Sequence, residues 1–208
     1  MVVQSFRISQ SRSYGSALER AISSAQKLND RVIEQHILGN LGLAYVAIGE
    51  HRRAIKFFEQ VLAIARDTKD RRIEGLTLGN IGIAYRELGE PRLAIEYHEQ
   101  HLAIAQELRN KRGEGMALTN LGIAYVDLGE TSRAIKCYEQ ALTIAREMGD
   151  LITESRILWN ISLTLDKLGN RDQAIACAEA ALKIREQIRD PSTAAAMRAQ
   201  LAEWREQE

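Results

Sequence analysis

The sequence predicts an all-α solenoid of stacked antiparallel helix pairs, and three observations lead to this fold class. The heptapeptide Gly-Asn-Ile-Gly-Ile-Ala-Tyr at 79–85 recurs with small changes at 39–45 and 119–125, and in degenerate form at 159–163. Its asparagines keep a constant spacing and stand at Asn40, Asn80, Asn120 and Asn160. The chain is rich in Ala, Leu, Glu and Arg, and it shows no strand-like alternation. A helix-forming repeat of about 40 residues is typical of a solenoid.

The first helix of each repeat is expected to begin after a residue whose side chain can accept a backbone N–H. These capping residues are Asp30, Asp70, Asn110 and Asp150. A glutamate follows each cap four residues later, where its charge favours the positive end of the helix dipole. A glycine is expected to end each first helix in the left-handed conformation. These glycines are Gly49, Gly89, Gly129 and Gly169.

The second helix of each repeat carries an Ala-Ile pair and, further along, a leucine. Four complete helix pairs result, at 31–70, 71–110, 111–150 and 151–190. Residues 1–30 then form a truncated N-terminal repeat, and residues 191–208 form a C-terminal capping helix that turns polar. Alternatively, both ends are cuts in a longer array. We favour a segment of a larger protein, because the N-terminal repeat is truncated in phase with the others.

Composition argues against several classes of partner. The chain carries 28 basic and 28 acidic side chains, so it lacks the basic excess that nucleic acids and anionic membranes require. No apolar run reaches the roughly 20 residues that span a bilayer, and the first residues do not form a signal peptide. Two cysteines do not indicate an oxidising compartment, so a cytoplasmic setting is expected.

The pattern Asn-Leu-Gly-x-Ala-Tyr-x-x-x-Gly-Glu, followed by Ala-Ile-x-x-Tyr-Glu-Gln-x-Leu, resembles the tetratricopeptide repeat over residues 16–204. Its unit is longer than the usual 34 residues of that family. The long unit is similar to the arrays of Pins/LGN polarity scaffolds, kinesin light chains and bacterial signalling proteins. The resemblance implies a right-handed superhelix whose first helices line a concave groove.

With Asn80 facing that groove, helical steps of three and four place further residues beside it. The candidate peptide-binding residues are Asn40, Asn80, Asn120, Asn160, Leu43, Leu76, Ile83, Arg86, Met116, Ile123, Arg156, Trp159 and Leu163. An asparagine amide both donates and accepts, so it can pair with the backbone of any extended peptide. Three small residues beside the row are expected to leave room for that approach. They are Gly39, Gly79 and Thr119.

Two alternatives remain open for this face. The asparagines could instead bridge adjacent first helices, and the apolar row could instead belong to the core between repeats. Hydrogen bonds at about 0.5–1.5 kcal/mol each cannot by themselves offset an association cost of about 4–15 kcal/mol. Burial of apolar side chains must therefore supply much of any binding free energy.

Residues that could suggest catalysis or metal binding have simpler explanations. His98 and His101 align with core positions of the other repeats, and no third ligand is evident for a metal. Cys137 and Cys177 lie one repeat apart, which exceeds disulfide reach, so free thiols are expected. We therefore expect no metal, no cofactor and no enzymatic activity.

The leading functional hypothesis is a non-enzymatic scaffold that binds an extended or partly helical segment of a protein partner in the groove. The alternative is a self-association or sensor module of a larger signalling ATPase or protease. In that case the array would form homo-oligomers or be fused to an effector domain.

Overall fold

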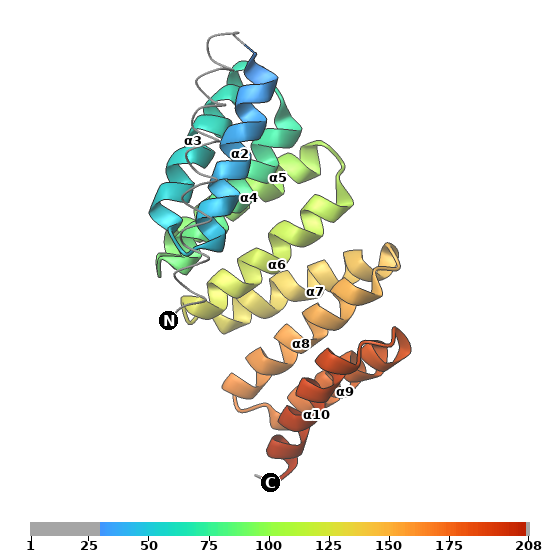
Figure 1. Cartoon of the computed structure of the whole chain (residues 1–208). Helices are drawn as coiled ribbons and strands as arrows, with labels where there is room; N and C mark the ends of the chain where they lie inside the picture. Colours follow the sequence, from blue (N-terminus) through green and yellow to red (C-terminus); the bar gives the residue numbers. More distant parts are fainter. Residues whose placement is uncertain (1–29, 207–208) are drawn as a thin grey trace. The chain divides into compact units, whose positions relative to one another are not determined.

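The computed structural model describes residues 30–206, and every regular element in that range is an α-helix (Figure 1). The chain divides into unit 1 (Met1–Leu108) and unit 2 (Arg109–Glu208), which we describe separately. The helices of unit 1 are α2 (Arg31–Ala47), α3 (His51–Asp67), α4 (Arg71–Glu87) and α5 (Pro91–Glu107). Those of unit 2 are α6 (Lys111–Asp127), α7 (Thr131–Glu147), α8 (Leu151–Lys167), α9 (Arg171–Gln187) and α10 (Pro191–Glu206).

This arrangement confirms the all-α class. The predicted truncated repeat at 1–30 lies almost wholly outside the described residues, as do residues 207–208. Within 30–206, no helix combines the length and the apolar character needed to cross a bilayer.

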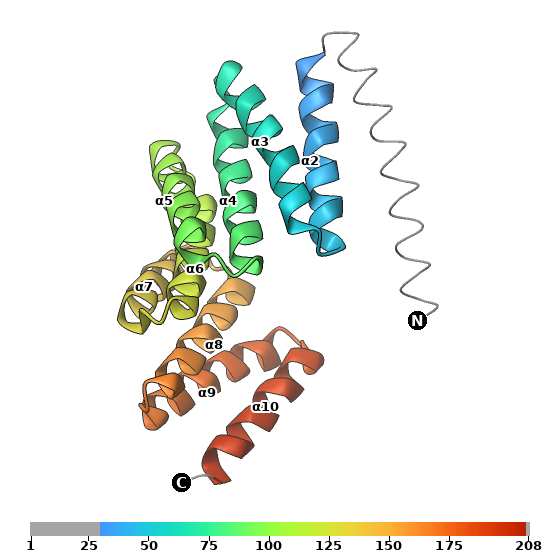
Figure 2. The ribbon, with the colours of Figure 1, turned by 90° about the vertical axis from the view of Figure 1, so that its left-hand side faces the viewer.

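Uniform helix length explains the 40-residue period. Each helix from α2 to α9 has 17 residues, and three residues connect each to its successor. Such short connections make consecutive helices antiparallel neighbours. Figures 1 and 2 show this arrangement within each unit.

The predicted N-caps of the first helices are confirmed. The Oδ1 atoms of Asp30 and Asp70 each accept a backbone N–H three residues later, at 3.0 Å. Asn110 and Asp150 make the same bond at the same length in unit 2. The four caps fix where each repeat begins, because they satisfy backbone donors that the helix itself leaves without a partner.

The turn after each first helix depends on a glycine, as predicted. Gly49, Gly89, Gly129 and Gly169 all have φ between 75° and 82°. In the first of these turns, the Glu50 N–H donates to the Tyr45 carbonyl at 2.9 Å and the Gly49 N–H to that of Val46 at 3.0 Å. These two bonds form a Schellman motif, which satisfies carbonyls at the end of α2.

The turn after each second helix also contains a residue in the left-handed conformation, but this residue is not always a glycine. Lys69 and Arg189 each have φ 58°, whereas Gly149 occupies the equivalent place after α7. A side chain in this conformation costs about 1–2 kcal/mol relative to the right-handed one. These turns therefore carry local strain that glycine relieves.

We expect Lys69→Gly to raise the free energy of unfolding by up to about 1 kcal/mol, because strain relief exceeds the added entropy of the unfolded chain. Urea denaturation followed by circular dichroism measures this change. Lys56→Gly, in the middle of α3, is the matched control and should destabilise by about 1 kcal/mol. A loss of stability in Lys69→Gly would contradict the prediction.

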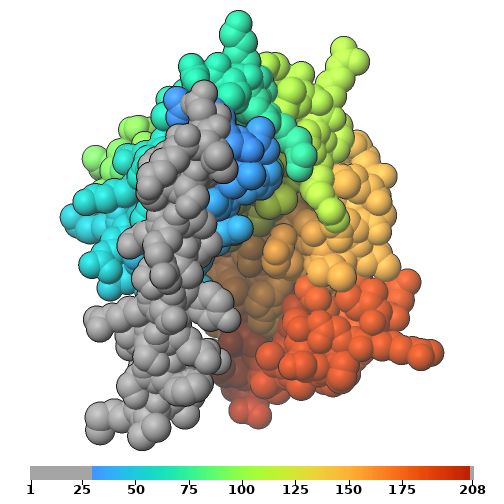
Figure 3. Space-filling model, turned by 45° about the horizontal axis from the view of Figure 1, so that its top comes forward, coloured from blue at the N-terminus to red at the C-terminus, as the bar shows by residue number. Residues whose placement is uncertain are grey.

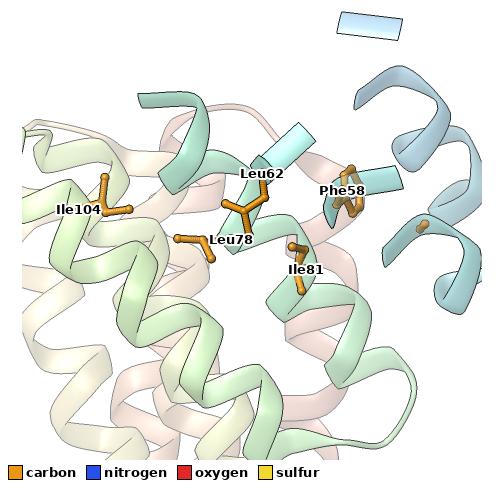
Figure 4. Packing of buried hydrophobic residues seen from close by; sticks show 6 residues of the cluster. Phe58, Leu62, Leu78, Ile81 and Ile104 are labelled. Atoms are coloured by element: carbon orange, nitrogen blue, oxygen red, sulfur yellow. The ribbon is translucent and has the colours of Figure 1, made fainter. Parts of the chain in front are cut away.

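The core of unit 1 lies between its helices, and Figure 4 shows Leu62, Leu78 and Ile81 meeting where α3 packs on α4. All three side chains are buried, together with Phe58 and Ile104. Two tyrosines of the repeated motif pack against the second helix of their own pair. Tyr45 stacks on Phe57 and Tyr85 stacks on Tyr97, each pair with ring centroids 5.3 Å apart. Figure 3 shows side chains filling the spaces that the ribbon view leaves between helices.

Each helix pair is joined by a small residue facing a larger one. A Cβ added at Gly42 would lie 2.4 Å from the Phe58 ring. A Cβ at Gly82 would lie 2.6 Å from the His98 ring, and one at Gly122 would lie 2.3 Å from the Tyr138 ring. In the last pair the sizes change, with Ser162 in place of glycine and Ala178 in place of the ring. Close approach of the two helices therefore depends on matched sizes at this position.

Ion pairs connect one helix pair to the next in each unit. In unit 1, Arg66 Nε donates to buried Glu74 at 2.9 Å, and Arg71 pairs with both Glu74 and Glu107. Burial raises the pKa of the Glu74 carboxyl, but the hydrogen bonds from Arg66 and Arg71 outweigh it and hold that pKa below its ordinary value. In unit 2, Arg146 and Glu154 repeat the first of these contacts at 2.8 Å.

Candidate functional site

The four asparagines of the repeat lie near the middle of the first helices. Asn40 is exposed and the other three are half-buried. Among the described residues, no hydrogen bond involves any of these four side chains, and none joins Asn40 to Asn80 or Asn120 to Asn160. Their amides therefore remain available as donors and acceptors.

Unit 1 has a pocket of about 510 Å³ between α2 and α4, with α3 at its base. It brings together four of the predicted site residues, Asn40, Leu43, Leu76 and Asn80. The remaining lining residues are Val32, Gln35, His36, Gly39, Phe58, Val61, Thr68, Asp70, Arg72, Ile73 and Thr77. Its volume falls within the range of about 300–1,000 Å³ that is typical of ligand sites.

The walls of the unit 1 pocket are largely apolar and open to solvent. Val32 is 61% exposed, Leu43 52% and Leu76 39%. A bound apolar group would bury these side chains, and such burial stabilises by about 25 cal/mol per Å². The pocket thus offers the apolar surface that the asparagines alone cannot supply.

Some polar side chains of the unit 1 pocket already form hydrogen bonds within the chain, and others do not. Asp70 caps α4 through the Ile73 N–H, and the Nδ1 atom of His36 lies 2.9 Å from the Val32 carbonyl oxygen. Arg72 forms no ion pair within residues 30–206. The pocket therefore carries one arginine without an ion pair and one carboxylate that caps a helix.

Unit 2 has a smaller pocket of about 220 Å³ at the equivalent place in the repeat. It contains the predicted residues Met116 and Arg156, but neither Asn120 nor Asn160 lines it. Asp150 lies in this pocket with a lowered pKa, because its carboxylate accepts the backbone N–H and the hydroxyl of Thr153. This pocket therefore differs in chemistry from the one in unit 1.

The remaining predicted residues lie outside both pockets. Ile83 and Ile123 are half-buried, and Leu163 is 36% exposed. Arg86 donates to Glu87 on its own helix. Trp159 stacks on Trp204 of α10 with ring centroids 6.2 Å apart.

Two residues expected to leave room beside the asparagines are placed differently by the structure. Gly79 is buried, and a Cβ there would lie 2.8 Å from the His101 ring. Thr119 is also buried, and its hydroxyl donates to the Gly115 carbonyl at 2.8 Å. This part of the prediction is wrong, because both positions turn from the groove toward the second helix. Gly39 is half-buried and lines the unit 1 pocket.

The candidate set lacks eleven lining residues of the unit 1 pocket, and helical spacing could have found at least two of them. Val32 and Arg72 stand eight residues before Asn40 and Asn80 respectively. Two helical steps of four keep a residue near the same face of the helix. Extending that step by one further turn would have found both residues.

The histidines of α5 belong to the core, as predicted. His98 is 1% exposed and His101 is 4% exposed. Burial lowers the pKa of His98 to about 4, with smaller effects from His101 and Arg86, and burial also lowers the pKa of His101. Both imidazoles are therefore neutral near pH 7. Within the described residues, no group of three or more potential ligands could hold a metal ion.

Comparison with known proteins identifies the repeat. Sequence models described as the tetratricopeptide repeat match residues 37–72, 73–147 and 155–188. The chain belongs to the tetratricopeptide repeat family. The tetratricopeptide repeats make it an all-α solenoid and imply a protein-interaction scaffold, since the fold is generally a non-enzymatic interaction module. No curated protein sequence matches this chain.

Solved structures share the fold of this tetratricopeptide repeat chain. BtubC (BKLC) from P. vanneervenii has 23% identity and a TM-score of 0.78, over 91% of this chain and 79% of that protein. The STAND protein PH0952 from Pyrococcus horikoshii has a tetratricopeptide repeat sensor. It has 19% identity and a TM-score of 0.75, over 85% of this chain and 28% of that protein. A Rap protein complexed with competence and sporulation factor has 16% identity and a TM-score of 0.65, over 97% of this chain and 61% of that protein. At these identities the likeness shows the fold alone, and the chain spans less than two thirds of the last two proteins.

Proposed function

We propose that this chain is a non-enzymatic scaffold that binds an extended segment of a partner protein along its first helices. One observation carries the proposal. In unit 1, the side chains of Asn40 and Asn80 line the same pocket as exposed Leu43 and Leu76, and no hydrogen bond within the described residues uses either amide.

The two asparagines of unit 1 can bind one extended backbone. The side chains of Asn40 on α2 and Asn80 on α4 line the same pocket. An extended chain advances roughly 3.3 Å per residue, so different peptide groups of one segment can pair with the two amides. The absence of a bond between Asn40 and Asn80 favours this role over a bridge between helices.

Apolar burial supplies the remaining affinity in this proposal. Two asparagine bonds contribute about 0.5–1.5 kcal/mol each, which is less than the cost of association. Val32, Leu43 and Leu76 line the pocket on both sides of the asparagines. The amides then set the path of the bound backbone, and the apolar residues hold a side chain. The Rap protein complexed with competence and sporulation factor supports a bound partner on this fold.

Removal of both amides from unit 1 tests this function. A library of random twelve-residue peptides is first selected against the purified chain, and one enriched peptide is synthesised. We expect Asn40→Ala combined with Asn80→Ala to weaken its binding by about 1–3 kcal/mol, because two hydrogen bonds are lost. Isothermal titration calorimetry measures the affinity, and thermal unfolding should remain close to that of the parent.

The matched control removes two amides from second helices. Gln60 of α3 and Gln100 of α5 are exposed, and each donates to a carbonyl one turn earlier. Replacing both with alanine should leave peptide binding unchanged. If the asparagine variant loses stability while its peptide affinity stays at the parental value, the bridging role is correct and the proposal is not.

A sensor or self-association module is a second candidate, and the tetratricopeptide repeat sensor of PH0952 is the observation that favours it. In this case the exposed apolar side chains of unit 1 would contact another domain or a second copy of the chain. Light scattering at several protein concentrations shows whether these side chains bind a second copy of the chain or a separate peptide partner. A mass that rises with concentration supports self-association, and a constant monomer mass contradicts it.

A further inference from the structure

The histidines of the chain all belong to unit 1. They are His36, His51, His98 and His101, and the sequence of unit 2 contains none. Histidine is the side chain whose ordinary pKa places its change of charge between about pH 5 and pH 8. A response of the fold to mild acid is therefore expected in unit 1 and not in unit 2.

Two of these histidines lie where α5 packs on α4. A Cβ added at Gly82 of α4 would lie 2.6 Å from the His98 ring, and one at Gly79 would lie 2.8 Å from the His101 ring. In the part of the chain that the structure describes, the Nδ1 atom of each ring is buried without a hydrogen-bond partner. A proton taken up by either ring would place an uncompensated charge in this contact, which disfavours the packed arrangement.

The charged groups near these rings do not stabilise an added proton. Arg86 of α4 and His101 both act against protonation of His98, in addition to its burial. Burial also lowers the pKa of His101. The carboxylate of Glu107 joins α5 to α4, but it is exposed and paired with Arg71. Other ionisable side chains that meet between the two helices are the stacked Tyr85 and Tyr97.

Helix α4 connects this contact to the unit 1 pocket. Leu76 and Asn80 line the pocket from α4, and the same helix packs against the two imidazoles. A buried cluster forms a second connection, because it joins Ile104 of α5 to Phe58 of α3, which lines the pocket (Figure 4). Separation of α5 from α4 therefore removes support from two sides of the pocket.

We infer that the contact between α4 and α5 is an acid-sensitive switch, in which protonation of His98 and His101 separates the two helices and releases the segment bound by unit 1. This regulation rests on the function proposed above, because it concerns the same pocket. A bound segment that requires the packed helices in turn opposes the uptake of protons. Unit 2, which has no histidine, stays folded over the same change of pH.

Hydrogen exchange of the full chain, followed by mass spectrometry at pH 7 and pH 5, tests the opening without any ligand. Protection factors correct for the slower intrinsic exchange in acid. They should fall about tenfold in α4 and α5, because these helices open locally. They should stay constant in α7, α8 and α9. An equal fall in both units, or no fall in α4 and α5, would overturn the inference.

The other repeats supply matched replacements for the two histidines. His98→Phe combined with His101→Val copies Phe58 and Val61 of α3. This double variant should keep the protection of α4 and α5 at pH 5. A loss of protection equal to that of the parent would show that the two imidazoles are not the switch.

A second variant and a control guard against a misfolded replacement. His98→Tyr combined with His101→Ala copies Tyr138 and Ala141 of α7, and should show the same insensitivity to acid. His51 is the first residue of α3, outside the contact between α4 and α5. His51→Gln should therefore keep the parental response, and the inference is wrong if this control alone removes it.

Peptide affinity tests the connection to the pocket. A histidine-free peptide selected at pH 7 from the random twelve-residue library should bind the parent about tenfold more weakly at pH 5. The variant with His98→Phe and His101→Val should lose clearly less affinity. His36 also lines the pocket, but it is present in both proteins and its effect cancels in the comparison.

Failure of the switch and failure of the proposed function give different results. If α4 and α5 open in acid while peptide affinity stays constant, the switch is wrong and peptide binding stands. If no peptide prefers the parent over the Asn40→Ala, Asn80→Ala variant at pH 7, the proposed function itself is wrong.

Discussion

Gly122→Ala is expected to destabilise the chain by about 3 kcal/mol, because the new methyl group has no space. Its Cβ would lie 2.3 Å from Cε1 and 2.6 Å from Cδ1 of the Tyr138 ring. That ring is 2% exposed, so the surrounding core prevents it from moving away. Helices α6 and α7 must separate or the ring must change rotamer. Urea denaturation followed by circular dichroism measures the loss.

The chain provides two controls for this substitution. Gly39 of α2 has no neighbouring atom within 4 Å of an added Cβ, so Gly39→Ala should stabilise by up to about 1 kcal/mol through helix propensity. Gly122→Ser combined with Tyr138→Ala recreates the Ser162 and Ala178 pair of the last repeat. The double variant should be more stable than the sum of its single variants predicts, by at least about 1 kcal/mol. A neutral Gly122→Ala would show that the helices do not meet as closely as described.

Acid is expected to destabilise the chain through His98. This buried imidazole is neutral in the folded state with a pKa of about 4, against an ordinary value of 6.5. Between these two values the unfolded chain binds more protons than the folded one, so stability falls as pH decreases. The contribution of neutral His98 to the free energy of unfolding is fully present above about pH 6.5 and is lost progressively as the pH falls toward 4. Between pH 7 and pH 5 the loss is about 2 kcal/mol.

His98→Phe isolates this effect, because Phe58 occupies the equivalent place in α3. Urea midpoints measured at pH 7 and pH 5 should differ clearly less in the variant than in the parent. His101, whose pKa is lowered by burial, leaves the variant with some pH dependence of the same sign. At pH 5 Glu74, which is paired with Arg66 and Arg71, contributes little, because its lowered pKa affects stability only where the unfolded carboxylate begins to bind protons. Equal midpoint shifts in the parent and in His98→Phe would contradict the neutral buried imidazole.

The sequence predicts the repeat itself well, because each boundary has its own local cause. The capping side chains of Asp30 and Asp70 and the left-handed glycines at 49 and 89 act within one turn of the chain. Their consequences can be read without knowledge of packing. Burial of His98 and His101 also follows from alignment with core positions. The division into four repeats with a capping helix at 191–208 stays a prediction.

The site was harder to predict, because it depends on contacts between helices. Helical spacing alone places Gly79 near the face that carries Asn80. In the structure, however, the ring of His101 packs against Gly79. Trp159 carries a large apolar surface, yet only the path of α10 brings Trp204 against it. Arg72 stands out only once its place in the unit 1 pocket is known. Helical spacing finds candidate faces, and packing decides which part of each face is open.

The most direct test of the groove follows the side-chain amide N–H signals of the chain by nuclear magnetic resonance while a selected peptide is added. We expect the signals of Asn40 and Asn80 to shift as peptide is added, and the shifts to saturate with the affinity that calorimetry gives. Signals of Gln60 and Gln100 on the second helices should stay in place. Unchanged asparagine signals, with shifts confined to Gln60 and Gln100, would contradict a partner segment held along the first helices.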